Sequence, residues 1–279
     1  MGKSETALEV ARVFNCEIVN GDAFQAYKEM DIGVAKPPKE YFDIVKHHLF
    51  SFVDIDQEYS IADYQKDLRK TIDEILSRGK NVVIVGGSGL YIRSGLYDYI
   101  FEEQKHLDMN KYEKLSNEEL HKELEKIDPK QAEIIHMNNR KRVLRAIEIY
   151  LSNGKTKTEI IDSQEHKLVY DARFFVRDMD RKELYSLIDQ RVDKMMADGL
   201  LDEVKSILSK HGESSKALQG IGYKELIPVI KGECSLERGV ELVKKNSRNY
   251  AKRQVTFIKH QFPVVFYKNS QDLLEILKK

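Results

Sequence analysis

The strongest constraint on the fold is an all-apolar segment, residues 82–85, which stands between a helix-like stretch and a cluster of glycines. Residues 62–78 repeat apolar side chains at helical spacing and end at Gly79, and residues 17–20 carry a shorter apolar pair upstream. Buried strands separated by helices are typical of a parallel sheet covered on both faces. We therefore predict the α/β class, with a parallel sheet flanked by helices.

The strand signal disappears between residues 102 and 157, where apolar side chains recur only at helical spacing. Downstream, a strand is predicted at 173–176, helices at 181–197, 200–211 and 236–260, and a last strand at 263–267. We therefore predict a catalytic core formed by residues 1–101 and 158–279, with a helical insertion domain at 102–157.

The composition is that of a globular protein rather than a disordered or membrane one, with 41% hydrophobic and 33% charged residues. No apolar run reaches the length of a membrane span, and the first residues lack a signal-peptide pattern. The two cysteines are far apart and form no metal-binding or redox spacing, which suits reduced thiols. We expect a cytoplasmic protein without membrane contact.

Gly2, Lys3 and Ser4 precede an amphipathic helix and match the end of a phosphate-binding loop. Backbone amides and the helix dipole attract the anion, Lys3 adds a positive charge, and Ser4 can ligate Mg²⁺. The complete pattern also needs a preceding strand and an upstream glycine, so we expect the first strand of the core to be absent from this chain.

Two further segments belong to the same predicted edge of the sheet. Asp22 follows the strand at 17–20, and the glycine turn 86–89 follows the strand at 81–85. Open parallel sheets bind ligands at the carboxyl ends of their strands, where a carboxylate can accept a proton or hold a metal. Taken alone, each segment is equally compatible with an ordinary turn.

Positive charge is concentrated in two helical stretches, although the whole chain has 46 basic and 46 acidic residues. Residues 136–157 contain six lysines and arginines against one glutamate, and residues 244–260 contain six against no acid. Such stretches suit contact with a phosphate backbone, and they are also compatible with a solvated helix face.

Taken together, several ordered blocks resemble the tRNA dimethylallyltransferases almost from end to end. The blocks are Gly2–Ser4, Asn20–Tyr27, Met30–Pro37, His47–Leu49, Tyr59–Tyr64, Val85–Tyr91, Asn138–Ala146, Gly220–Lys224 and Ala251–Gln254. The resemblance implies a P-loop-like core with a helical insertion domain that contacts tRNA. It also implies transfer of a dimethylallyl group from dimethylallyl diphosphate to N6 of the adenosine 3′ to the anticodon, in tRNAs that read codons beginning with U.

The resemblance also assigns roles at the phosphate end. It implies that Asp22, Ser4 and Arg191 are catalytic, with Asp22 as the base toward N6. Diphosphate would be held by Gly2, Lys3, Ser4 and Arg191, and Mg²⁺, the implied cofactor, by Ser4. The partners would be dimethylallyl diphosphate and the anticodon stem-loop of tRNA, and we expect the chain to act as a monomer.

The implied tRNA contacts come from four segments. They are Asp22, Ala23, Phe24 and Gln25 around the extruded adenosine; Ser88; Lys141, Arg142, Val143, Leu144 and Arg145; and Gln219, Gly220, Ile221, Gly222, Tyr223 and Lys224 on the stem and loop. Gln25 can offer a base edge both a donor and an acceptor. The chain departs from the family pattern at Ser88, usually threonine, and at Leu187, often arginine.

Three other functions remain open from the sequence. A P-loop kinase would use the same Gly2–Ser4 segment and Asp22 to transfer a phosphoryl group. A related prenyltransferase would take a free adenine nucleotide as the acceptor. An RNA-binding protein without catalysis would bind tRNA with a steep dependence on salt and without turnover.

Overall fold

The computed structural model describes residues 2–101 and 109–279. They divide into two compact units: unit 1 contains Met1–Leu96 and Asp171–Lys279, and unit 2 contains Tyr97–Tyr170. Unit 2 begins before residue 102 and ends after residue 157, the predicted limits of the insertion domain. The reason is local, because the Asp98 amide donates to the Lys167 carbonyl at 2.9 Å and ties the two connecting segments together.

The first sheet of unit 1 is parallel, in the order β2-β1-β3. Its strands are β1 (Cys16–Asn20), β2 (His47–His48) and β3 (Asn81–Val85). Ile18 is opposite Val83 and Asn20 is opposite Val85, so β1 and β3 end side by side. The predicted α/β class with a parallel sheet flanked by helices is confirmed.

Helices cover the two faces of this sheet. Cys16 and Ile18 of β1 pack against α1 (Lys3–Val13), whereas the alternating residues Glu17 and Val19 point to the other face. There α3 (Ile61–Ser77) packs on β1 and β3, and α4 (Gly89–Leu96) packs on α3. The short α2 (Lys39–Ile44) precedes β2.

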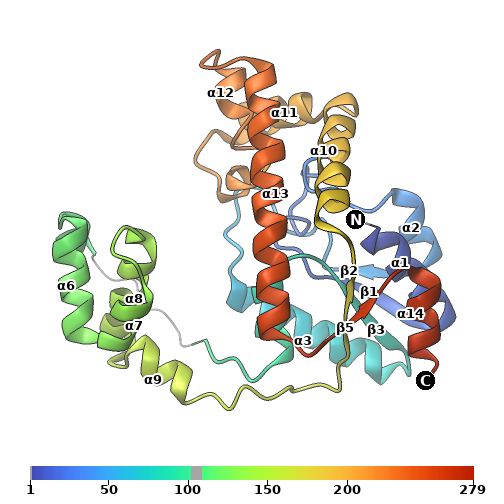
Figure 1. Cartoon of the computed structure of the whole chain (residues 1–279), viewed down its shortest axis with the longest axis horizontal. Coiled ribbons are helices and arrows are strands. Elements are labelled where there is room, and N and C mark those ends of the chain that lie inside the picture. Colours follow the sequence, from blue (N-terminus) through green and yellow to red (C-terminus); the bar gives the residue numbers. More distant parts are fainter. Residues whose placement is uncertain (1, 102–108) are drawn as a thin grey trace. The chain divides into compact units, whose positions relative to one another are not determined.

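A second, two-stranded parallel sheet joins β4 (Phe174–Arg177) to β5 (Val264–Tyr267). Helix α14 (Ser270–Leu277) follows β5 and packs beside α1. Val10 of α1, Tyr267 and Leu273 form a small buried cluster there. The carboxyl-terminal elements are thus fastened to the helix that begins with Lys3 (Figure 1).

The remaining elements of unit 1 form a helical layer whose core is continuous with the turn after β1. They are α10 (Arg181–Ala197), α11 (Leu200–His211), the 3₁₀ turn η1 (Lys216–Gln219), α12 (Ile227–Ile230) and α13 (Leu236–Gln261). Helix α13, with 26 residues, runs beside α10 (Figure 1). Ala26 and Met30, from the segment after β1, are buried among α10, α11 and η1 residues.

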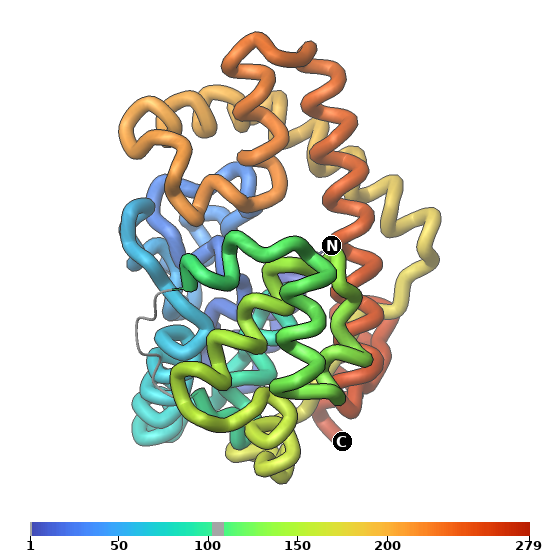
Figure 2. The backbone as a smooth tube through the Cα atoms, turned by 90° about the vertical axis from the view of Figure 1, so that its left-hand side faces the viewer, coloured from blue at the N-terminus to red at the C-terminus, as the bar shows by residue number. Residues whose placement is uncertain are grey.

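Unit 2 contains five described helices. They are α5 (Asn110–Glu113), α6 (Asn117–Ile127), α7 (Pro129–Ile134), α8 (Arg140–Asn153) and α9 (Lys157–Asp162). Leu120, Leu124, Val143 and Ile147 are at most 1% exposed and form its core. The backbone of these helices runs from green to yellow-green in Figure 2. Ser116 and Thr156 form capping boxes that start α6 and α9. Across the described residues of both units, no helix is long and apolar enough to cross a membrane.

Candidate functional site

The turn after β1 is built around a buried asparagine. Asn20 is wholly buried, and its amide nitrogen donates to the Asp22 and Leu49 carbonyls, both at 2.9 Å. The Asn20 side-chain oxygen Oδ1 accepts a hydrogen bond from the Asp22 backbone amide at 2.8 Å. One carboxylate oxygen of Asp22 accepts the Phe24 amide at 3.1 Å. The turn therefore fixes the Asp22 carboxylate and leaves its second oxygen available to a ligand.

The glycine turn after β3 is locked to the turn after β1. A Cβ atom at Gly86 would lie 2.0 Å from the Gly21 carbonyl carbon, so only glycine permits this approach. The Ser88 amide donates to the Gly21 carbonyl at 3.1 Å, and the Ser88 hydroxyl accepts the Ala23 amide at 3.0 Å. Ser88 therefore lies beside the turn that carries Asp22.

The amino end of α1 faces the same glycine turn. Gly2 adopts φ 75°, and Lys3 begins a helix whose first amides have no side-chain cap. Such a helix end is suited to an anion, because the unpaired amides and the dipole add to the Lys3 charge. A Cβ atom at Gly87 would come within 3.3 Å of Lys3 Nζ, so a larger residue there would crowd the ammonium group.

Lys3, Asp22 and Arg191 influence one another electrostatically. Burial of its charged end lowers the pKa of Lys3, nearby Asp22 opposes this effect, and Arg191 adds to it. Burial likewise lowers the pKa of Arg191, which Asp22 partly restores. Both residues are exposed along much of their length, and the burial that shifts their pKa values concerns their charged ends. The structure thus brings together these three residues, which are separated by up to 188 positions in the sequence.

Two residues of α13 join this site, and the sequence did not identify their role. The Gln254 amide donates to the Gly87 carbonyl at 2.7 Å. The Tyr250 hydroxyl lies near the side chains of Ser88 and Gln254, which act to lower its pKa. Burial raises the pKa of Tyr250, and the Asp22 charge raises it further. The available signal was their spacing, because positions 250 and 254 share one helix face between exposed cations.

A second predicted contact segment, residues 219–224, also lies against the Asp22 turn. A Cβ atom at Gly220 would be 3.3 Å from the Phe24 ring, and Gln219 and Lys224 are exposed. Ile221 is half-buried and Gly222 is buried. Tyr223 is 0% exposed, and its hydroxyl donates to Glu203 at 2.6 Å. The Tyr223 ring therefore belongs to the core of unit 1, and its predicted RNA contact stays a prediction.

The comparisons with known proteins agree on one family. The sequence profile of the IPP transferase family matches residues 25–261. The chain belongs to the IPP transferase family. The tRNA dimethylallyltransferase of Staphylococcus haemolyticus is 41% identical over 99% of this chain and 86% of its own length, and that of Bacillus subtilis is 41% identical over 96% and 87%.

Solved structures of the IPP transferase family share the fold. A tRNA isopentenylpyrophosphate transferase from Staphylococcus epidermidis is 40% identical, with a TM-score of 0.74 over 99% of this chain and 94% of that one. A eukaryotic dimethylallyltransferase described as acting on tRNA is 27% identical, with a TM-score of 0.86 over 99% of this chain and 74% of that one.

In unit 2, some of the predicted tRNA-contact residues of α8 lie at the surface and others lie in the core. Lys141, Arg142 and Arg145 are exposed, Leu144 is half-buried, and Val143 is 1% exposed inside the hydrophobic cluster. The Val143 side chain therefore supports α8 from the core side. Burial, Arg142 and Arg145 lower the pKa of Lys157, and Asp128 opposes them. Lys157 thus extends the positive surface and was missing from the predicted contacts.

Two of the positively charged side chains of α13 form ion pairs that the sequence of the helix does not reveal. The stretch contains no acid of its own, but Arg248 pairs with Asp189 at 2.5 Å and Lys244 pairs with Asp193 at 2.6 Å. Both carboxylates come from α10, which also carries Arg191. These two cations therefore fasten α13 to α10, so the absence of acids within the stretch does not leave all six of its cations unpaired. Exposed cations remain at Lys245, Lys252, Arg253 and Lys259.

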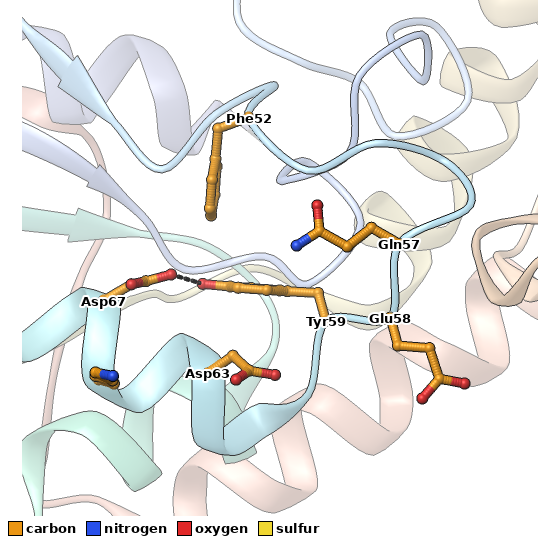
Figure 3. A pocket seen from close by; sticks show the side chains of 7 residues that line it. Phe52, Gln57, Glu58, Tyr59, Asp63 and Asp67 are labelled. Atoms are coloured by element: carbon orange, nitrogen blue, oxygen red, sulfur yellow. Dashed lines mark hydrogen bonds between the residues drawn. The ribbon is translucent and has the colours of Figure 1, made fainter.

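A separate pocket of about 260 Å³ in unit 1 is lined by acidic and aromatic side chains (Figure 3). Tyr59 donates to Asp67 at 2.8 Å, and Asp63 caps α3. Glu58 is a third carboxylate in the lining. Three carboxylates repel a diphosphate. This lining, in spite of Lys66, is therefore a poorer site for a polyanion than the amino end of α1.

Proposed function

We propose that this chain transfers a dimethylallyl group from dimethylallyl diphosphate to N6 of the adenosine 3′-adjacent to the anticodon of tRNAs that read codons beginning with U. The products are N6-(dimethylallyl)adenosine and diphosphate. The observation that carries the proposal is the position of the Asp22 carboxylate beside Lys3, Ser88 and Arg191, in a chain of the IPP transferase family. This arrangement supports the proposal, because a carboxylate that can accept a proton lies near a helix end suited to an anion.

In this proposal the diphosphate lies at the amino end of α1. The amides of Gly2, Lys3 and Ser4, the Lys3 ammonium and the Arg191 guanidinium surround it. Negative charge develops on the leaving diphosphate as the bond from C1 to oxygen breaks, and preorganised cations and amides stabilise that charge. Holding one such group in place is worth about 10²–10³-fold in rate.

Mg²⁺ is part of the proposal and would neutralise diphosphate charge. The described residues hold no group of three or more His, Cys, Asp or Glu suited to a metal. Mg²⁺ commonly takes one or two protein oxygens together with substrate phosphates and waters. The Ser4 hydroxyl, in the first turn of α1, fits that role.

The acceptor side uses the turn after β1. The N6 lone pair forms the new bond to C1 of the prenyl group while the old bond to the diphosphate oxygen breaks. A proton passes from N6 to the Asp22 carboxylate, so charge and atoms balance. An adenine amino group is a weak nucleophile, and a positioned base contributes about 10²–10⁴-fold. The adenosine must leave its stack to reach Asp22, which a single-stranded loop permits at low cost.

We assign the contacts with the anticodon stem-loop to residues of each unit. In unit 2 these are Lys141, Arg142, Arg145 and Lys157, which crowd positive charge around α8. In unit 1 they are Gln219, Lys224 and the exposed cations Lys252 and Arg253 of α13. We place the reaction in the cytoplasm and treat the acting species as a monomer.

The test is the mass of an unmodified tRNA with adenosine 3′ to its anticodon, after incubation with this chain, Mg²⁺ and dimethylallyl diphosphate. The expected result is a gain of one prenyl unit, which Asp22→Ala abolishes. Parallel reactions with free AMP and with ATP plus AMP separate the nucleotide prenyltransferase and the kinase. No mass gain on tRNA, with the chain folded, would overturn the proposal.

A further inference from the structure

The carboxylate of Glu203, on α11, is surrounded by donors from one loop. Its Oε2 accepts the amides of Asp31 and Ile32 at 2.9 and 2.8 Å. Its Oε1 accepts the Gly33 amide at 3.0 Å and the Tyr223 hydroxyl at 2.6 Å. Three successive amides that converge on one anion form a nest. Glu203 therefore holds the loop 31–33 by three hydrogen bonds, and a fourth joins it to Tyr223.

The same loop is packed as well as hydrogen-bonded. A Cβ atom at Gly33 would lie 2.5 Å from the Tyr223 ring, so the glycine allows the loop to lie flat on a wholly buried aromatic side chain. At the far end of the loop, the Lys36 ammonium donates to the Tyr27 carbonyl at 2.7 Å and to Asp31 at 2.8 Å. The loop is thus fixed at both ends.

The two residues that follow the loop 31–33 bind the Gln25 side chain. The Gln25 amide nitrogen donates to the Val34 carbonyl at 2.9 Å and to the Ala35 carbonyl at 3.3 Å. The reverse orientation would oppose the Gln25 oxygen to two carbonyl oxygens, which cannot bond to it. Hence the side-chain NH₂ group of Gln25 is used in bonds within the protein, and only its side-chain oxygen, an acceptor, is available to a ligand. The sequence had allowed it to offer both.

We propose that Glu203 is a positioning residue for adenosine selection, an inference that rests on the proposed function. By accepting hydrogen bonds from the amides of residues 31–33, Glu203 fixes the position of the adjoining Val34 and Ala35 carbonyls. These carbonyls bind the Gln25 NH₂ group, so the Gln25 oxygen is the atom left to face a ligand. Gln25 follows Asp22 by three positions. An acceptor suits the 6-amino group of adenine and opposes the 6-keto group of hypoxanthine. Selection between these bases thus depends on a carboxylate that touches neither.

The experiment compares two anticodon stem-loop RNAs, with adenosine or inosine 3′ to the anticodon, in equilibrium binding at fixed salt. Wild type is expected to prefer adenosine by roughly 10-fold, the effect of one good base contact. In Glu203→Gln the new amide opposes the amides of the nest, so the preference should fall to about 2-fold or less and transfer should slow. The affinity for dimethylallyl diphosphate should stay unchanged, which a general loss of structure would not allow.

Asp202→Asn is the matched control, because Asp202 neighbours Glu203 on α11, is exposed, and pairs only with Lys205 among the described residues. It should keep the wild-type preference. If Glu203→Gln does not fold, Tyr223→Phe decides, since it removes one donor to Glu203. An unchanged preference with normal transfer overturns the positioning role alone. Absence of transfer by wild type overturns the proposed function, and the positioning role falls with it.

Discussion

Two carboxylates lie at opposite ends of β1, and their surroundings differ. Glu17 is 3% exposed and bonds to His48 at 2.6 Å, Arg78 at 2.7 Å and Lys80 at 3.0 Å. Asp22 is half-buried, keeps one oxygen available, and has no salt-bridge partner within the part of the chain that the structure describes. The saturated carboxylate joins structural elements, and the unsaturated one is available to a substrate. Surroundings, rather than residue type, separate the two roles.

The largest expected effect tests the unsaturated end. Asp22→Asn keeps the acceptor for the Phe24 amide and removes the base, so kcat should fall about 10²–10⁴-fold. Single-turnover transfer at saturating substrates measures this loss. The midpoint of thermal unfolding should hardly change, because no ion pair is broken. A large drop in stability would place Asp22 in the same class as Glu17.

Lys3 tests the anion site beside Asp22. Lys3→Met should slow transfer about 10²-fold, since one charge on the leaving diphosphate is lost. Because burial lowers the pKa of Lys3, donor binding by wild type should weaken as pH rises, at a lower pH than for an ordinary lysine. Lys3→Arg keeps its charge and should remove this alkaline decline in a titration of donor affinity. A decline that persists in Lys3→Arg would assign it to another group.

The saturated end should respond in stability instead. Burial alone would raise the pKa of Glu17, but hydrogen bonds from Lys80, His48 and Arg78 outweigh it and lower the pKa to about 2. A lowered folded-state pKa stabilises the fold above the ordinary value of 4.5, and this stabilisation is lost as pH falls from 4.5 toward 2. Glu17→Gln should therefore cost about 3 kcal/mol at pH 7. Urea unfolding at pH 7 and pH 3 tests this.

The control for Glu17 is Glu9→Gln on the exposed side of α1, which should change stability by less than about 0.5 kcal/mol. Prenyl transfer by folded Glu17→Gln at pH 7 should match wild type within about two-fold, because the substituted group lies outside the site. A selective loss of activity would show that the two ends of β1 are not functionally separate.

The smallest effect concerns cations rather than carboxylates. Arg142→Ala should weaken tRNA binding several-fold and reduce the slope of log K against log salt by about 1. Arg248→Ala, which breaks the pair with Asp189, should lower stability and leave that slope nearly unchanged. Filter binding across a salt series measures both. Equal slopes for the two variants would mean that α8 and α13 share one role.

Much of the fold follows from local pattern. The strand predicted at 81–85 is β3, and the helix predicted at 62–78 is α3 shifted by one residue. In contrast, β2 has only His47 and His48 and exists because β1 pairs with it, a contact with no local signal. Helix α14 was not predicted either, although its apolar face packs against the region around Val10 of α1.

The site was predictable where one motif carries one function. Local motifs made Gly2–Ser4 and Asp22 candidates, and in the structure Lys3 and Asp22 lie close enough to influence each other. The ion pairs that occupy Lys244 and Arg248 could not be found, because their carboxylates lie on α10, more than 50 positions away. Glu203 and Tyr223 illustrate the same limit. Their hydrogen bonds to the loop 31–33 depend on tertiary packing that periodicity does not encode.

The close approach of Gly86 to Gly21 has a consequence for motion. The proposed function assigns the diphosphate to the side of the turn after β3 and the base to the turn after β1. These two turns share two backbone hydrogen bonds, from Gly21 to Val85 at 2.8 Å and from Ser88 to Gly21 at 3.1 Å, with no side chain between the two glycines. Neither turn can open without displacing the other. Ordering one by its ligand therefore orders the second, so donor and acceptor should bind with positive cooperativity, each slowing the dissociation of the other.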